Sequence, residues 1–143
     1  MCIFMRKLNS IYIIDDDPIT VFGLRKMLKT ITICKDITDF ENGRLALEAL
    51  KKRIELKLPC PEVIFLDINM PIMDGWEFLE ELVALNIPEK IIINVITSSI
   101  DPIDYQRWND FRLRCWHYLN FKNKPLYKLE TTDLSRGHLT PRP

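Results

Sequence analysis

Residues 63–75, VIFLDINMPIMDG, give the strongest indication of the fold in this sequence. The first four residues are apolar on both alternating faces, as expected of a central strand in a parallel sheet. Asp67 follows this run directly, and a loop then leads into a helical pattern at 76–85. The stretch therefore predicts a buried strand, an acidic residue at its carboxyl end, and a helix after the loop.

Strand and helix patterns alternate on both sides of this stretch. Apolar runs predict further strands at 11–14, 31–34 and 91–96, and a fifth strand within 115–121. Helical periodicity predicts helices at about 18–29, 44–56, 76–85 and 102–111, and a weak fifth helix after residue 125. Five strands alternating with helices predict an α/β fold, in which helices cover both faces of a parallel sheet.

Composition narrows the class of protein. The chain has 143 residues, 47% of them hydrophobic and 28% charged, which suits one compact globular domain. The formal net charge is zero, so there is no electrostatic reason to expect nucleic acid or a charged membrane as the main partner. No run reaches the roughly 20 apolar residues of a membrane span, and we expect a cytoplasmic protein.

Polar side chains stand where the predicted strands end. Asp15 and Asp16 follow the first strand, and Asp67 follows the third. Thr97 follows the fourth strand and Lys124 the fifth. Because the carboxyl ends of parallel strands meet at one edge of an open sheet, these five residues are expected to converge there.

Three carboxylates at one place repel each other, so either their pKa values rise or a cation neutralises them. A site built from oxygen ligands suits Mg²⁺. An aspartate can act as a nucleophile toward a phosphoryl group, which predicts an acyl phosphate on one carboxylate. Lys124 would then neutralise one phosphoryl oxygen, and the Thr97 hydroxyl would bond another.

At four stretches, 13–18, 63–75, 96–99 and 124–125, the chain resembles the response-regulator receiver family. The resemblance covers about residues 8–129. It implies a flavodoxin-like, doubly wound sheet of five parallel strands in the order 2-1-3-4-5. It also implies a leader at 1–7 and a tail at 130–143, which we expect to be partly disordered because its end is polar and rich in proline.

The resemblance also implies a role for each site residue. Asp67 is the expected phosphoacceptor, and Asp15 and Asp16 bind Mg²⁺ together with Asp67. Asn69 supplies a backbone carbonyl to the metal. Thr97 is the switch hydroxyl and Lys124 contacts the phosphoryl group. The Lys124-Pro125 peptide bond is a candidate for the cis form.

Signal output is expected to couple Thr97 to an aromatic residue on the fifth strand. Phe121 fits the family spacing best, and Tyr118 is the alternative. The implied partners are a sensor histidine kinase or a histidine phosphotransfer protein, and a downstream protein target. The face formed by the fourth helix, fifth strand and fifth helix is the one through which such domains commonly dimerise or dock.

The chain departs from the family pattern near its end. The stretch from Thr97 to Lys124 is a few residues longer than usual, and Lys122 stands where an apolar strand residue is expected. Residues 131–133, Thr-Thr-Asp, also weaken a fifth helix. These departures leave the predicted phosphorylation site intact but affect the expected output face.

Two other functions are compatible with parts of the pattern. A haloacid-dehalogenase-type phosphatase also uses an aspartate nucleophile, Mg²⁺, a threonine and a lysine. Such a phosphatase needs an acid two residues after the nucleophile for proton transfer, whereas this chain has Asn69 at that position. The metal-binding acids of that family also come late in the chain, whereas the acidic pair of this chain precedes Asp67. The other alternative is a receiver-like module that docks without being phosphorylated. We therefore expect a phosphoacceptor that catalyses only its own phosphorylation and dephosphorylation, with no DNA-binding or catalytic effector after residue 130.

Overall fold

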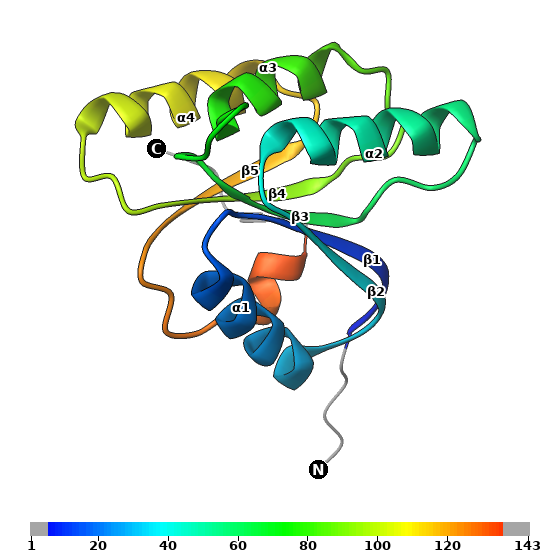
Figure 1. Ribbon diagram of the computed structural model, residues 1–143, viewed down its shortest axis with the longest axis horizontal. Coiled ribbons are helices and arrows are strands. Elements are labelled where there is room, and N and C mark those ends of the chain that lie inside the picture. Colours follow the sequence, from blue (N-terminus) through cyan, green and yellow to red (C-terminus); the bar gives the residue numbers. More distant parts are fainter. Residues whose placement is uncertain (1–5, 136–143) are drawn as a thin grey trace.

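The computed structural model describes residues 6–135 and contains one five-stranded parallel sheet in the order β2-β1-β3-β4-β5. Helices α2, α3 and α4 cover one face of the sheet, and α1 and the short 3₁₀ helix η1 cover the other (Figure 1). This confirms the predicted flavodoxin-like architecture. The elements are β1 (Arg6–Ile14), α1 (Pro18–Ile31), β2 (Thr32–Phe40), α2 (Gly43–Glu55), β3 (Val63–Asp67), α3 (Gly75–Ala84), β4 (Ile92–Thr97), α4 (Pro102–Arg114), β5 (Tyr118–Asn123) and η1 (Thr131–Leu134).

Each α-helix begins where a polar side chain caps it. The side-chain oxygens of the capping residues accept backbone N–H groups of the first helical turn, which would otherwise lack partners. These residues are Asp17, Asn42, Asp74 and Asp101. The capping residues stand in the loops that follow the strands, so helix initiation and strand termination are encoded together at one edge of the sheet.

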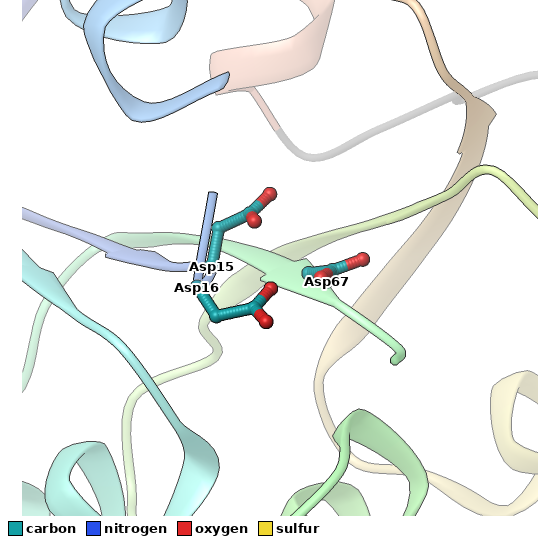
Figure 2. Close-up of side chains that lie close together, drawn as sticks. All are labelled: Asp15, Asp16 and Asp67. Atoms are coloured by element: carbon teal, nitrogen blue, oxygen red, sulfur yellow. The ribbon is translucent and has the colours of Figure 1, made fainter. Parts of the chain in front are cut away.

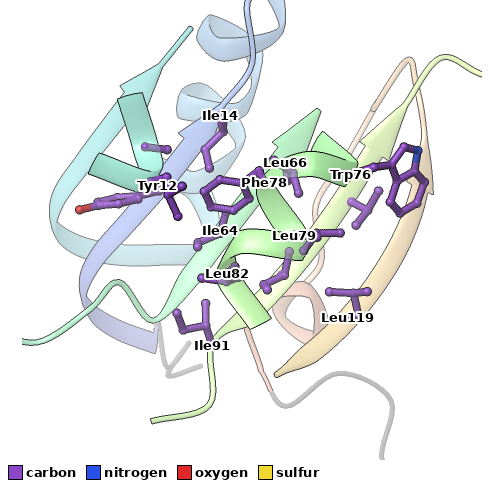
Figure 3. Packing of buried hydrophobic residues seen from close by; sticks show 14 of the residues in the cluster. Tyr12, Ile14, Ile64, Leu66, Trp76, Phe78, Leu79, Leu82, Ile91 and Leu119 are labelled. Atoms are coloured by element: carbon purple, nitrogen blue, oxygen red, sulfur yellow. The ribbon is translucent and has the colours of Figure 1, made fainter. Parts of the chain in front are cut away.

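The central strands are buried because helices cover both of their faces. Every residue of β3 and β4 is buried, which explains why most of their side chains are apolar on both faces. Between the sheet and helices α2–α4, the core contains Tyr12, Phe78 and Trp76 among other side chains (Figure 3). The second core, on the α1 side, includes Ile13, Phe65 and Leu134.

Strand boundaries differ from the predictions at the outer strands. The first strand begins at Arg6, within the stretch assigned to a leader, because it pairs with β2 from Arg6↔Thr32 onward. The second strand continues to Phe40 rather than ending at residue 34. The fifth strand is displaced toward Asn123. Cross-strand pairing extends these strands past their apolar cores, which a hydrophobic pattern does not reveal.

The predicted fifth helix is wrong for the described residues. Between β5 and residue 135 the only helix is η1, whose Asp133 accepts the Glu130 N–H at 2.8 Å and pairs with Lys122 Nζ at 2.7 Å. The Asn94 amide donates to the Asp133 carbonyl at 2.8 Å. Residue 122 therefore tolerates a lysine because a carboxylate on the covering segment neutralises it.

This difference changes two expectations about the end of the chain. The expected output face includes a fifth helix, and that helix is absent from the described residues. Within the tail predicted to be partly disordered, Asp133 and Leu134 are buried against the domain, while residues 136–143 lie outside the described part. The Lys124-Pro125 bond is cis, as predicted. None of the helices in residues 6–135 has the length and apolar character needed to cross a membrane.

Candidate functional site

Three aspartates meet at the carboxyl edge of the sheet. Asp15 and Asp16 follow β1, and Asp67 is the last residue of the adjacent strand β3 (Figure 2). One carboxylate oxygen from each of the three lies within 4.8 Å of the others. Asp15 and Asp67 are buried, whereas Asp16 is exposed to solvent. The predicted acidic cluster is therefore assembled by two neighbouring strands.

Backbone amides and a lysine hold these carboxylates. Asp15 Oδ1 accepts the Asp17 N–H at 2.9 Å, and Asp67 Oδ1 accepts the Ile68 N–H at 2.9 Å. Lys124 Nζ lies 2.9 Å from Asp15 Oδ2 and 3.3 Å from Asp67 Oδ1. The lysine thus reaches from the end of β5 across the edge of the sheet and bridges the two buried carboxylates.

Burial raises the pKa of Asp67 to about 6, and the nearby charge of Asp15 contributes in the same direction. Burial also raises the pKa of Asp15. For Lys124, burial lowers the pKa, but its hydrogen bond to Asp15 and the charges of both aspartates outweigh burial and raise the pKa overall. The three ionised carboxylates and one ammonium have a net charge of about −2, so an added cation would relieve their repulsion.

The donor set fits Mg²⁺. Carboxylate oxygens within a few ångströms of one another are the hard ligands that this ion selects, and the exposed Asp16 leaves the cluster open to solvent. Asn69 is exposed in the loop two residues after Asp67, and its backbone carbonyl remains the further donor predicted from the sequence. These residues would hold the ion, with Asp15, Asp16 and Asp67 as the carboxylate donors.

Thr97 ends β4, and a continuous series of hydrogen bonds connects it to α4. The Ser99 N–H donates to Thr97 Oγ1 at 3.0 Å, and the Asp101 N–H donates to Ser99 Oγ at 3.1 Å. The Ile103 N–H then donates to Asp101 Oδ1 at 3.0 Å. The Lys124 N–H donates to the Thr97 carbonyl at 2.8 Å, which fixes the end of β5 beside the end of β4.

The two candidate switch aromatics lie on opposite faces of the sheet. Phe121 pairs with Val95 and packs against the α4 rings Tyr105 and Trp108, with centroid distances of 5.5 and 5.7 Å. Tyr118 belongs to the core on the α1 side. Phe121 is therefore the aromatic next to α4, on the side where the predicted coupling to Thr97 requires it.

Gly75 belongs to the site, although the sequence pattern does not single it out. A side chain at Gly75 would place its Cβ 2.5 Å from the Asp67 carbonyl oxygen and 2.9 Å from Ile68 Cα. The Gly75 N–H donates to the Ile68 carbonyl at 2.8 Å. The start of α3 is therefore pressed against the backbone of Asp67, and only glycine fits this approach. The Asp-Gly pair after the loop is the available signal, but by itself it indicates only turn chemistry.

Comparisons with known proteins agree with this geometry. A family model described as the response regulator receiver domain matches residues 11–113. The chemotaxis protein CheY of Listeria monocytogenes is 37% identical over 87 residues, which cover 59% of this chain and 65% of that protein. Two other curated relatives are longer, and this chain spans 24% and 33% of their lengths.

Solved structures show the same fold. A two component response regulator from Cytophaga hutchinsonii has a TM-score of 0.73 at 27% identity, over 90% of this chain and 95% of that one. The Mn²⁺-bound form of response regulator Rcp1 has a TM-score of 0.65 at 24% identity, over 87% of this chain and 86% of that one. The second likeness is one of fold alone.

Proposed function

Because this chain belongs to the response regulator receiver family of two-component signalling, we propose that it acts as a stand-alone receiver that is phosphorylated on Asp67. The observation that supports this most directly is the bridge from Lys124 to Asp15 and Asp67 beside a third carboxylate. Under this proposal, Asp67 supplies the nucleophilic carboxylate, Asp15 and Asp16 supply cation ligands, and Lys124 supplies a positive charge for the incoming phosphoryl group.

In the proposed reaction, a carboxylate oxygen of Asp67 attacks the phosphorus of a phosphohistidine on a kinase or phosphotransfer protein. The P–N bond breaks, the histidine nitrogen leaves with the electron pair, and an acyl phosphate forms on Asp67. Lys124 would then pair with a phosphoryl oxygen, and the Thr97 hydroxyl would donate to another. Water later attacks the phosphorus and restores the carboxylate, so the chain is a phosphoacceptor rather than an enzyme acting on a separate substrate.

We propose Mg²⁺ as the resident cation, held by Asp15, Asp16, Asp67 and the Asn69 carbonyl. When bound, it neutralises charge on the phosphoryl group during transfer. The carboxylate donors and the Mn²⁺-bound form of the structurally similar Rcp1 support a divalent ion here. Output would pass in the cytoplasm to another protein, by docking or by onward phosphoryl transfer, with Thr97 and Phe121 as the switch pair.

The proposal is tested with a small phosphoryl donor. The purified chain is incubated with Mg²⁺ and acetyl phosphate, and its intact mass is followed over time beside the variants Asp67→Asn and Asp17→Asn. Asp17 is a matched control, because asparagine caps a helix as well as aspartate does and the residue stands outside the acidic cluster.

We expect a phosphoryl mass gain in the wild-type chain and in Asp17→Asn, and none in Asp67→Asn or when Mg²⁺ is chelated. A folded wild-type chain that gains no mass, and that also does not bind the phosphoryl mimic beryllofluoride, would contradict the proposal and favour a module that docks without phosphorylation. Release of phosphate without accumulation of the phosphorylated chain, at many turnovers on several phosphate esters, would instead indicate a phosphatase.

A further inference from the structure

Two separate routes lead from the acidic cluster to helix α4. The first is the series of hydrogen bonds from Thr97 through Ser99 to Asp101, which caps the helix. Each step joins a side-chain oxygen to a backbone N–H two residues later, so the loop has little freedom to move without moving the helix. Displacement of Thr97 would therefore displace the first turn of α4.

The second route runs through α3. Gly75 packs on the Asp67 carbonyl and donates to the Ile68 carbonyl, and a reciprocal pair of hydrogen bonds between Asp74 and Glu77 fixes this end of the helix. Trp76 is the next residue after Gly75 and is only 6% exposed. The position of the Trp76 indole is consequently tied to the backbone of Asp67.

The two routes meet at one hydrogen bond. The Trp76 indole N–H donates to Asp104 Oδ1 at 3.1 Å, and Asp104 stands in the first turn of α4. The Trp76 ring also stacks on Phe111 of α4, with centroids 5.7 Å apart and an interplanar angle of 9°. A groove of about 400 Å³ between α3 and α4 borders these two rings.

The contacts at the two ends of this groove differ in burial. At the end near the acidic cluster, the Trp76–Asp104 bond joins a buried indole to a half-buried carboxylate. At the other end, Arg114 pairs with Glu80 at 3.2 Å, and both side chains are more than half exposed. An exposed ion pair holds two helices weakly, whereas a hydrogen bond from a buried donor to a carboxylate is a stronger restraint.

We propose that the Trp76–Asp104 hydrogen bond restrains α4 in the unphosphorylated arrangement, and that it opposes phosphorylation of Asp67. This inference rests on the proposed function. When Thr97 is drawn toward a phosphoryl group on Asp67, the first turn of α4 moves with it, while Trp76 stays with Asp67 through Gly75. The bond between Trp76 and Asp104 must then lengthen or break. Both residues are positioning residues, because neither contacts the reacting atoms.

The restraint can be tested because the Trp76–Asp104 hydrogen bond and ligand binding at Asp67 must affect each other equally. If occupation of the site weakens the bond, then loss of the bond strengthens occupation of the site by the same factor. We expect Trp76→Phe and Asp104→Ala each to bind beryllofluoride with Mg²⁺ three- to tenfold more tightly than the wild-type chain, which corresponds to about 0.7–1.4 kcal/mol. The double variant should show no further gain, since each single variant already removes the bond.

Binding is measured by fluorine NMR of the bound beryllofluoride, which does not depend on tryptophan fluorescence. Phenylalanine at position 76 keeps an aromatic ring beside Phe111 and removes the indole donor together with part of the buried ring. Glu80→Gln is the matched control, because it removes the charge from an ion pair between the same two helices at the far end of the groove and should leave the affinity unchanged. Urea unfolding establishes that each variant is folded.

A second measurement uses the wild-type chain alone. Hydrogen exchange of the backbone amides of residues 103–106 should become faster when beryllofluoride binds, because the first turn of α4 loses its restraint. Unchanged or weaker binding in both single variants, or an equal gain in Glu80→Gln, would overturn the inference while leaving the proposed function standing. A wild-type chain that does not bind beryllofluoride would overturn both.

Discussion

His117 makes the stability of this protein depend on pH. The side chain is buried, and its Nδ1 accepts the Ile91 N–H at 2.9 Å. Burial lowers the pKa of His117 from 6.5 to about 4, and the nearby charge of Lys90 contributes in the same direction. A protonated imidazole would have to break the bond to Ile91, because Nδ1 would then be a donor facing a donor.

The direction of the pH dependence follows from the number of protons that the folded and unfolded chains bind at His117. Between pH 6.5 and about 4 the unfolded chain binds a proton at His117 that the folded chain does not. The free energy of unfolding therefore falls as the pH falls through this window, and the contribution of His117 is fully present only above it. The full shift corresponds to roughly 3 kcal/mol, and about 2 kcal/mol of it should be lost by pH 5.

The assay is urea unfolding at pH 7.5, 6 and 5 in the presence of a chelator, with the wild-type chain and His117→Asn compared. Asparagine keeps an acceptor for the Ile91 N–H but does not titrate. Any cavity left by the smaller side chain lowers stability equally at every pH, so the slope with pH is the quantity to compare. The wild-type chain should lose about 2 kcal/mol more than the variant between pH 7.5 and 5. Equal losses in the two proteins would refute the reasoning.

Four further substitutions test the described geometry. Gly75→Ala forces a Cβ against the Asp67 backbone and should lower the free energy of unfolding by about 1–3 kcal/mol, measured in urea. Gly23→Ala should instead raise it by roughly 0.5–1 kcal/mol, because Gly23 lies within α1 and no atom within 4 Å would meet its Cβ. Lys57→Gly should raise the midpoint of thermal unfolding, because Lys57 has φ 57° just after α2. A residue other than glycine in this left-handed conformation costs about 1–2 kcal/mol, so an unchanged midpoint would contradict the reasoning. Lys124→Met leaves two buried carboxylates without their ammonium, so calorimetry in metal-free buffer should show a loss of about 3 kcal/mol, partly restored by Mg²⁺.

The centre of the fold and the positions of the acidic residues are predictable from sequence. The run before Asp67 is apolar on both faces, which identifies a central parallel strand, and the topology then places residues that follow other strands at the same edge. The proximity of Asp15, Asp67 and Lys124 follows from this pattern and is confirmed by their contacts. Prediction succeeds here because burial leaves a strong pattern.

The outer strands and the end of the chain are less predictable. Lys122 breaks the apolar pattern of β5, and only the three-dimensional structure shows that Asp133, eleven residues later, neutralises it. The close approach of Gly75 to Asp67 depends on the angle at which α3 leaves its loop. Likewise, the Trp76–Asp104 bond joins residues 28 positions apart. Contacts of this kind depend on tertiary geometry and leave no periodic signal in sequence.

The position of Lys124 bears on the order in which a cation and a phosphoryl donor would bind at the acidic cluster. Its ammonium lies between the carboxylates of Asp15 and Asp67 and pairs with one oxygen of each. Under the proposed function, a divalent cation held by the same carboxylates would compete with the ammonium and leave it available to a phosphoryl oxygen. A phosphoryl donor that arrives before the cation would then meet a site in which Lys124 is still paired with Asp15 and Asp67.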